Sequence, residues 1–234
     1  MKAWFRNTID PLLHLAFPHV CEGCGSDVID KQHMICLRCL DSLPYTHFEN
    51  LPGNMIEKIF WGRLPLKAAS AQLYFTKESL VQSLVNNFKY KGNKELGFYL
   101  GKLMGKQIKA SARFSDINAL VPLPLFPSKE KKRGFNQAKI LCDGIAAILK
   151  IPVITSAVAR NEFTESQTKK NRVERWQNME GKFEIKDASS ISGKHVLLVD
   201  DVVTTGATLE ACGRELATTK NTEISLATLC FSGH

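Results

Sequence analysis

Four of the seven cysteines lie close together near the start of the chain, in a spacing that is typical of metal ligands. Cys21 and Cys24 form one C-x2-C pair, and Cys36 and Cys39 form a second pair after eleven intervening residues. Two such pairs can place four thiolates around one tetrahedral zinc ion, at about 2.3 Å each. The alternatives are a redox pair or two structural disulfides. Because four cysteines would fill the coordination sphere, we predict a structural zinc site and no Lewis acid.

A second chemically capable segment directly follows the apolar run 195–199. It comprises Asp200, Asp201, Val202, Val203, Thr204, Thr205, Gly206, Ala207 and Thr208. Adjacent carboxylates repel each other unless a cation or hydroxyl groups share them. Glycine and hydroxylated residues at the start of a helix let backbone N–H groups close on a phosphate. The segment has neither the lysine of a Walker A loop nor the glycine spacing of a dinucleotide loop, and it predicts a site for a phosphorylated, polyhydroxylated ligand.

Two polar segments could supply further contacts to such a ligand. Pro122, Leu123 and Pro124 end a predicted strand, and a basic run follows that contains Lys132 and Arg133 just ahead of a helix. The segment 160–178 is too polar for a core and carries Gln167, Thr168, Lys169, Arg172 and Arg175. We expect the cations to neutralise a diphosphate, and the segment 160–178 to close over it and exclude water. The alternatives are an exposed basic loop without a ligand and an exposed helix.

The elements that must hold these residues alternate between strands and helices from residue 116 onward. Apolar runs predict strands at 117–121, 153–155, 195–199 and 223–229, and helical spacing predicts helices at 135–150 and 207–218. Upstream, amphipathic helices are predicted at 79–91 and 95–108. This alternation indicates an α/β fold with a mostly parallel sheet, whose ligands bind beyond the carboxyl ends of the strands.

Composition places the chain among ordinary globular proteins. It has 234 residues, of which 44% are hydrophobic and 23% charged, and this excludes collagen-like and wholly disordered classes. No apolar run approaches the roughly 18 residues of a membrane span, and we find no signal peptide. We therefore expect no membrane insertion and a reducing, cytoplasmic location, where cysteines stay thiols or bind metal.

The net charge of +8 indicates an anionic partner. Residues 77–150 contain 14 Lys or Arg against 5 Asp or Glu, so most of the excess lies there. Phe88, Tyr90, Phe98 and Tyr99 fall in the same stretch. Such a surface could bind single-stranded DNA through phosphates and stacked bases, unless the aromatic side chains belong to the core.

The acid-rich segment 200–208 closely resembles the phosphoribosyl pyrophosphate (PRPP) loop of type I phosphoribosyltransferases. The order of motifs along the whole chain resembles the ComF family: cysteine pairs, then 89–92, 133–137, 167–175 and this loop. The resemblance implies a type I phosphoribosyltransferase-like α/β fold, with a mostly parallel sheet flanked by helices and a small N-terminal four-cysteine zinc finger. The implied domains are 1–50, with a helix and the finger, and 51–234, in which a helical hood or linker (51–115) precedes the α/β core (116–234).

The same resemblance implies PRPP with Mg²⁺ as the ligand. Asp200 and Asp201 would bind the ribose 2′- and 3′-hydroxyls, the residues 204–208 would wrap the 5′-phosphate, and 122–124 would form the pyrophosphate loop. Many members are linked to the uptake of single-stranded transforming DNA, which implies a role in natural competence with DNA and competence-machinery proteins as partners.

The alternative is an active phosphoribosyltransferase of nucleotide metabolism, a glycosyltransferase that releases pyrophosphate from PRPP as it transfers ribose 5-phosphate. Purine-salvage members carry an aspartate where this chain has Thr204, and no general base is evident. The acceptor, and whether turnover occurs, therefore stay open.

Overall fold

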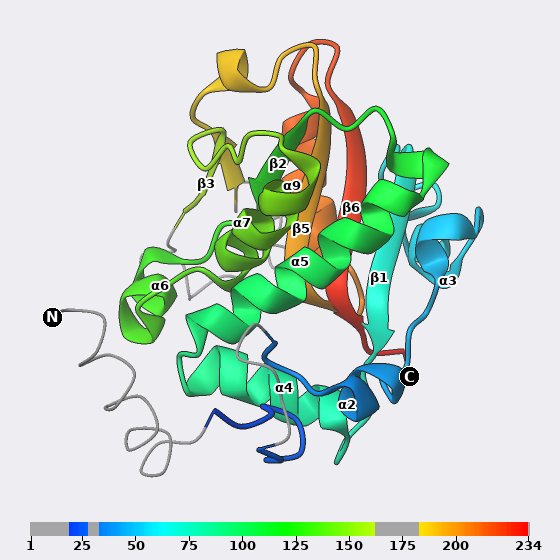
Figure 1. Cartoon of the computed structure of the whole chain (residues 1–234). Helices are drawn as coiled ribbons and strands as arrows, with labels where there is room; N and C mark the ends of the chain where they lie inside the picture. The colour runs from blue at the N-terminus through cyan, green and yellow to red at the C-terminus, as the bar shows by residue number, and fades with distance from the viewer. Residues whose placement is uncertain (1–18, 28–32, 162–182, 234) are drawn as a thin grey trace, which may run out of the picture.

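The computed structural model describes residues 19–27, 33–161 and 183–233, and a four-stranded sheet forms the centre of this part of the chain (Figure 1). The strand order is β1-β6-β5-β2, with bounds Ala68–Tyr74 (β1), Glu223–Phe231 (β6), His195–Val203 (β5) and Ala119–Pro122 (β2). All three pairings are parallel, which confirms the predicted α/β architecture. A short antiparallel pair, β3 (Val158–Arg160) and β4 (Phe183–Ile185), stands apart from this sheet.

Helices cover both faces of the sheet, and one hydrophobic cluster lies on each face. The first face packs against α4 (Leu80–Tyr90), α5 (Lys94–Ala110) and α7 (Gln137–Leu149). The second face packs against α3 (Met55–Phe60) and α9 (Ala207–Ala217). Burial on both faces explains why the central strands are nearly continuous apolar runs, as parallel strands usually are.

Most of the predicted elements are present, with shifted ends. The strand predicted at 195–199 continues to Val203 as β5, because its last residues still pair with β6. The stretch predicted as a strand at 153–155 makes a single bridge, between Val153 and Leu120. The sequence predicts no helix at α6 (Pro127–Arg133), where Pro127 begins the helix and Gly134, at φ 80°, ends it.

Strand β1 is not predicted from the sequence, because it lies inside the range expected to be helical. Its sequence is AASAQLY, whose small and polar residues do not show the alternation of apolar and polar residues that predicts a strand. Burial of six of its seven residues comes instead from pairing with β6 and from the covering elements. Tertiary packing therefore decides this strand, since its local composition does not favour one.

The cysteine segment near the start of the chain packs directly against α4. Cys21 and Cys39, the latter in α2 (Leu37–Asp41), belong to the same buried hydrophobic cluster as Phe88. The Glu22 carboxylate accepts hydrogen bonds from Asn87 and from Asn93, which flank the end of α4. The domain boundary predicted at residue 50 stays a prediction.

A short helix, η1 (Phe48–Asn50), connects the cysteine segment with the elements around β1. Across the three described ranges, no helix combines the length and the apolar character that crossing a membrane requires.

Candidate functional site

The paired acids lie where β5 leaves the sheet, and their side chains face opposite sides of it. Consecutive side chains of a strand alternate between its two faces. Asp201 meets Lys89 from α4 on the first face, whereas the charge of Asp200 acts on Cys212 of α9 on the second face. The two carboxyl groups therefore sit in different surroundings although they are adjacent in sequence.

Lys89 forms an ion pair with Asp201. Its Nζ atom lies 2.9 Å from Oδ2 of Asp201, and the two side chains are 17% and 14% exposed. Partial burial makes this pair less screened by salt than a surface pair. Lys89 therefore belongs to the acid pair, and it does not form part of the exposed basic surface in the stretch 77–150.

A second cation, Arg160 at the end of β3, acts on Asp200. Its guanidinium lies 3.9 Å from the ring centroid of Phe126 and 5.2 Å from that of Phe183. Burial lowers the pKa of Arg160, and the charge of Asp200 opposes this shift. Its buried Nε has no hydrogen-bond partner among the described residues.

Burial raises the pKa of Asp200 to about 8, with repulsion from Asp201 as the second cause. The backbone N–H of Asp201, 2.8 Å from Oδ1 of Asp200, opposes this rise, as do the charges of Lys89 and Arg160. Asp200 is therefore largely protonated at neutral pH in the protein alone. A ligand that supplies positive charge or hydroxyl donors would favour its ionised form.

The predicted phosphate loop forms a tight turn between β5 and α9. Thr204 and Thr205 are exposed, and Gly206 adopts φ 75° before α9 begins at Ala207. A Cβ atom at Gly206 would lie 2.7 Å from the Phe60 ring, so both the backbone and the packing require glycine. No side chain in the described part of the chain caps the N-terminus of α9, and first-turn N–H groups of this kind can bind an anion.

The predicted pyrophosphate turn lies beside this loop. Pro122 is aligned with Val199 at the end of β2, and the Leu123 N–H donates to the Val199 carbonyl at 2.9 Å. The Asn136 side chain donates to the Leu123 carbonyl at 3.1 Å, which fixes the turn from the start of α7. Leu123 is buried and Pro124 is half-buried. The structure thus brings 122–124 to the same edge of the sheet as the paired acids.

The remaining predicted basic residues lie in α6 or outside the described residues. Lys132 is exposed. Arg133 donates to Gln137 at 2.6 Å, and its guanidinium lies 5.8 Å from the centroid of the Tyr90 ring. Gln167, Thr168, Lys169, Arg172 and Arg175 lie outside the described residues.

Lys89 and Arg160 are not assigned to the acid pair by the sequence alone. Both residues come from elements that precede β5 in the chain, and only the fold brings them to its end. The helical pattern of α4 could have indicated a buried partner for Lys89, because it places this lysine at a half-buried position, where its charge needs a partner. For Arg160 the sequence offers only a single arginine at the end of a short strand, and this pattern alone does not predict a contact with Asp200.

The four cysteines of the two C-x2-C pairs form one cluster. Their sulfur atoms all lie within 4.8 Å of one another, and those of Cys24 and Cys36 are 3.8 Å apart. Tetrahedral zinc with four thiolates separates its ligands by about 3.8 Å, given Zn–S bonds of about 2.3 Å. The cluster therefore has the ligand type and spacing to hold one such metal ion.

The local backbone prepares one thiolate in this cluster. Burial opposes ionisation of Cys21, but hydrogen bonds from the backbone N–H groups of Cys36, Cys24 and Gly23 outweigh it and lower the pKa of Cys21 to about 6. Burial and the neighbouring thiols raise the pKa of Cys39. A bound metal ion would displace the remaining protons, so that all four cysteines become thiolates.

A different charged cluster lies at the opposite edge of the sheet. His195 Nδ1 is 2.9 Å from Oδ1 of Asp116, and Nε2 is 2.9 Å from the Ser225 hydroxyl. The Lys67 ammonium pairs with both Asp116 and Glu223. These contacts connect the start of β5 with the start of β6 and with the segments that lead into β1 and β2.

Comparisons with known proteins agree with these features. A model of the phosphoribosyl transferase domain matches residues 131–234. Competence protein F of Haemophilus influenzae is 26% identical over 209 residues, which cover 87% of this chain and 86% of that protein. DNA utilization protein YhgH of Escherichia coli is 26% identical over 222 residues, or 92% of each chain. Competence protein ComFC of Bacillus subtilis is 30% identical over 145 residues, which cover 60% of this chain and 55% of that protein.

Competence protein F and YhgH align with most of the chain, and the domain match covers β3, β5 and α9 of the acid-pair site but begins after α4 and β2. The four-cysteine cluster lies ahead of that domain, as the order of motifs predicts. The chain is therefore similar over most of its length to competence protein F and DNA utilization protein YhgH, and its residues 131–234 match a phosphoribosyl transferase domain.

Proposed function

We propose that the chain binds PRPP together with Mg²⁺ at the carboxyl edge of its sheet, and that it supports the uptake or processing of single-stranded transforming DNA in natural competence. The single observation that carries the PRPP site is the acid pair followed by an uncapped helix N-terminus. Both the acid pair and the helix N-terminus suit PRPP, because carboxylates accept hydrogen bonds from ribose hydroxyls and the N–H groups at a helix N-terminus bind phosphate.

In this proposal, each group has a distinct task. Asp200 and Asp201 orient the ribose, the turn from Thr204 to Thr208 holds the 5′-phosphate, and the turn 122–124 faces the diphosphate. Mg²⁺, held with the diphosphate near the two carboxylates, would neutralise negative charge there. Lys89 already neutralises Asp201 in the protein alone, so it must share or release that carboxylate when the ligand arrives.

Isothermal titration calorimetry with PRPP and Mg²⁺ tests this site. We expect Asp201→Asn to weaken binding at least about tenfold, because a charge-assisted hydrogen bond contributes about 1.5–3 kcal/mol. Asp143→Asn is the matched control, since Asp143 pairs with Lys139 on the exposed side of α7. Equal affinities for the Asp201→Asn and wild-type proteins would show that the acid pair does not contact PRPP. If the wild-type protein does not bind PRPP, the proposed ligand is wrong.

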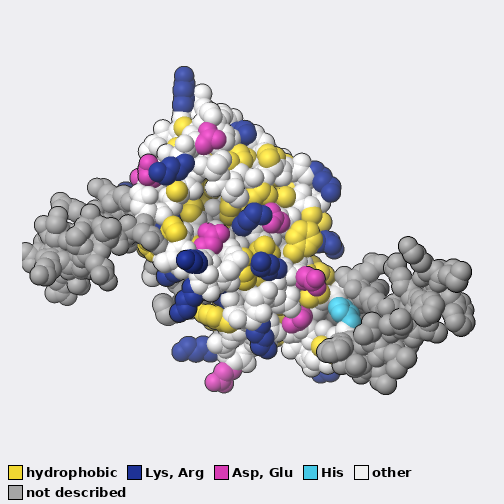
Figure 2. All heavy atoms as spheres, turned by 90° about the vertical axis from the view of Figure 1, so that its left-hand side faces the viewer, with side chains coloured by type: hydrophobic (Ala, Val, Ile, Leu, Met, Phe, Trp, Pro, Cys, Tyr) yellow, Lys and Arg dark blue, Asp and Glu magenta, His cyan; other side chains and the backbone are white. Residues whose placement is uncertain are grey.

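The competence role rests on the relatives together with a basic surface near the site. The two relatives that align with most of the chain are named for competence and for DNA utilization. In this chain, Tyr90 is 74% exposed and lies under Arg133, close to a helix whose last turn is Lys131, Lys132 and Arg133. Figure 2 shows dark-blue Lys and Arg side chains gathered over the lower left of the face seen there.

We propose that this basic aromatic patch, Tyr90 with Lys131, Lys132 and Arg133, contacts single-stranded DNA. Phe88 is buried and takes no part, whereas Tyr90 offers an exposed ring on which a base can stack. The exposed lysines of α6 would contact phosphates.

Fluorescence anisotropy with a labelled oligothymidylate, titrated at several salt concentrations, tests the patch. Lys131→Ala with Lys132→Ala should reduce the slope of log affinity against log salt by about 0.7 for each phosphate that no longer meets a lysine. Lys106→Ala with Lys109→Ala removes the same charge from exposed positions of α5 and serves as control. Equal slopes for the two double variants would show that the patch does not bind DNA.

Transfer of ribose 5-phosphate to an acceptor is the second candidate function, because it would use the same PRPP site. Release of pyrophosphate from PRPP, measured across candidate acceptors, tests it directly. Release that depends on the acceptor and disappears in Asp201→Asn would establish transfer. Binding of PRPP without release would favour a role for PRPP as a regulatory or stabilising ligand.

For the cysteine cluster we propose structural zinc, one ion per chain, because its four thiols leave no ligand position for catalysis. All seven cysteines are free thiols, which suits the reducing cytoplasm that we propose as the location.

A further inference from the structure

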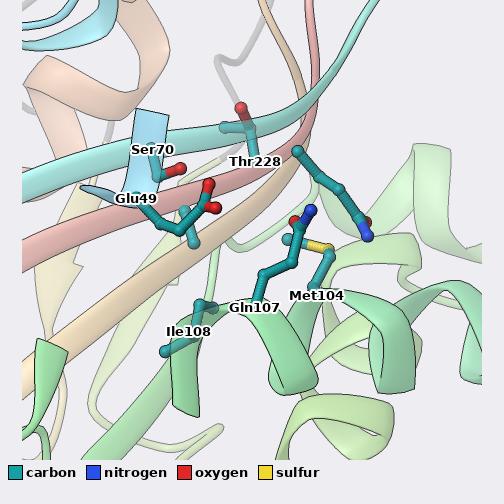
Figure 3. A pocket seen from close by; sticks show the side chains of 8 residues that line it. Glu49, Ser70, Met104, Gln107, Ile108 and Thr228 are labelled. Carbon is teal, nitrogen blue, oxygen red and sulfur yellow. The ribbon is translucent and has the colours of Figure 1, made fainter. Parts of the chain in front are cut away.

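A small cavity lies between β1, β6 and α5 (Figure 3). Its volume is about 10 Å³, enough for one water-sized species. The polar lining comes from Glu49, Ser70, Gln72 and Gln107. Figure 3 shows Glu49 and Gln107 reaching toward each other from opposite sides, while the hydroxyl of Thr228 points away.

Three buried polar atoms of this lining have no hydrogen-bond partner among the described residues. They are Oε2 of Glu49 and both side-chain polar atoms of Gln72. Each of these two residues is 4% exposed. Leaving such groups unpaired is costly, and buried carboxylates are normally paired with a cation.

Nothing in the described part of the chain supplies that cation. Oε1 of Glu49 accepts from the neutral Asn50 amide at 3.2 Å, and Nδ1 of the exposed His47 ring lies 3.7 Å from the same oxygen. No Lys or Arg of the described ranges pairs with Glu49. Oε2 of Glu49 therefore has neither a cation nor a hydrogen-bond donor beside it among the described residues.

We propose that this cavity binds one monovalent cation about the size of a water molecule, such as K⁺ or NH₄⁺. The available donors are a carboxylate oxygen, amide oxygens and a hydroxyl, which are the hard ligands that such ions prefer. A single positive charge matches the single carboxylate. Mg²⁺ fits poorly, because it keeps several of its own water molecules and needs more room.

The bound cation would tie three elements together. The backbone carbonyl of Glu49 accepts from the Ser111 hydroxyl, at the end of α5, at 2.6 Å. The carbonyl of Gln72 in β1 accepts from the N–H of Thr46 at 3.0 Å. A cation held by the side chains of Glu49, Gln72 and Gln107 would add a cross-link among η1, β1 and α5, and we expect it to raise the thermal stability of the chain.

Thermal unfolding of the whole protein tests the site, in buffers of equal ionic strength made with KCl, NH₄Cl or N-methyl-D-glucamine chloride. We expect the Tm to be about 3–6 °C higher with K⁺ or NH₄⁺, as for binding at about ten times the Kd. Glu49→Gln should abolish the difference between the salts. Glu130→Gln, at an exposed position of α6, should leave it unchanged.

A crystal soaked in Tl⁺, a heavy K⁺ analogue, gives a second measurement that does not depend on any variant. We expect an anomalous peak between Glu49 and Gln72. Equal Tm values in all three salts, or a salt effect that persists in a folded Glu49→Gln protein, would overturn the proposal. Density without an anomalous signal would identify the occupant as water and would overturn it as well.

Discussion

Asp200 and Asp201 show how neighbouring residues of one type can take different roles. The strand turns Asp201 toward Lys89, whose ammonium balances it at 2.9 Å. Asp200 faces the opposite side, where burial raises its pKa to about 8. One carboxyl is therefore charged and paired while the other holds a proton near neutral pH, so their repulsion is relieved before any ligand binds.

This difference predicts a pH dependence of stability. An unfolded aspartate titrates near about 3.9, whereas Asp200 in the folded chain titrates near about 8. Between these values the folded state holds one more proton, so the contribution of Asp200 to the unfolding free energy falls as pH rises from about 4 to about 8. Above that range the contribution is constant.

Asp200→Asn should remove this dependence and exceed the wild type at pH 9 by at least about 1.4 kcal/mol, the equivalent of one pKa unit. Urea unfolding at pH 5, 7 and 9 measures it, with Asp143→Asn as the exposed control. Parallel profiles for Asp200→Asn and wild type would show that the carboxyl titrates normally in the folded chain.

At the scale of elements, the turn between β5 and α9 joins the carboxylates to the free helix N-terminus. Gly206 makes this possible by adopting φ 75° and by letting the Phe60 ring of α3 approach closely. Helix α4 has a comparable double role, because Lys89 lies at the acid pair while the next residue, Tyr90, is exposed. Consecutive helical residues point about 100° apart, so one turn can serve two surfaces.

Gly206→Ala should both destabilise the chain and weaken PRPP binding. Gly193→Ala is the matched control, because Gly193 has φ 71° but no neighbouring atom within 4 Å of the place that a Cβ would take. The control should lose about 1–2 kcal/mol through backbone strain alone. Gly206→Ala should lose more, because the Phe60 ring must also move. Urea unfolding and PRPP calorimetry check this, and equal losses with intact binding would contradict a close-packed turn.

The sequence predicts the elements and site residues that depend on local pattern. We predict β5 and its carboxyl end from the apolar run 195–199 and the two aspartates after it. Helical spacing of apolar residues predicts α4, α5, α7 and α9. The strand β1 escapes prediction because Ala, Ser and Gln give it no periodic signal. Lys89 and Arg160 escape for a different reason, since only long-range packing determines which carboxylate each cation meets.

At the scale of the whole molecule, the cysteine cluster and the acid pair are connected through α4. Cys21 and Cys39 share a buried hydrophobic cluster with Phe88, and Gly23 lies so close to Leu80 that an added Cβ would be 2.6 Å from it. Lys89 follows Phe88 in the same helix and pairs with Asp201. We therefore expect a change in the cysteine segment to affect the acid pair through α4.

Loss of the zinc ion that we propose for this cluster should consequently affect more than the cysteine segment. In Cys39→Ser we expect no bound zinc and an unfolding free energy lower by about 3 kcal/mol or more, since structural zinc contributes directly to folding. The Tm should fall by about 6 °C or more. PRPP affinity should fall as well, because α4 loses part of the surface that positions Lys89.

Leu37→Ser is the matched control, because Leu37 lies in the same short helix as Cys39 but is 81% exposed. It should retain zinc, stability and PRPP binding. Elemental analysis, thermal unfolding and calorimetry on the two variants separate the possibilities. A folded Cys39→Ser protein without zinc but with full PRPP affinity would show that α4 holds Lys89 in place without support from the cysteine cluster.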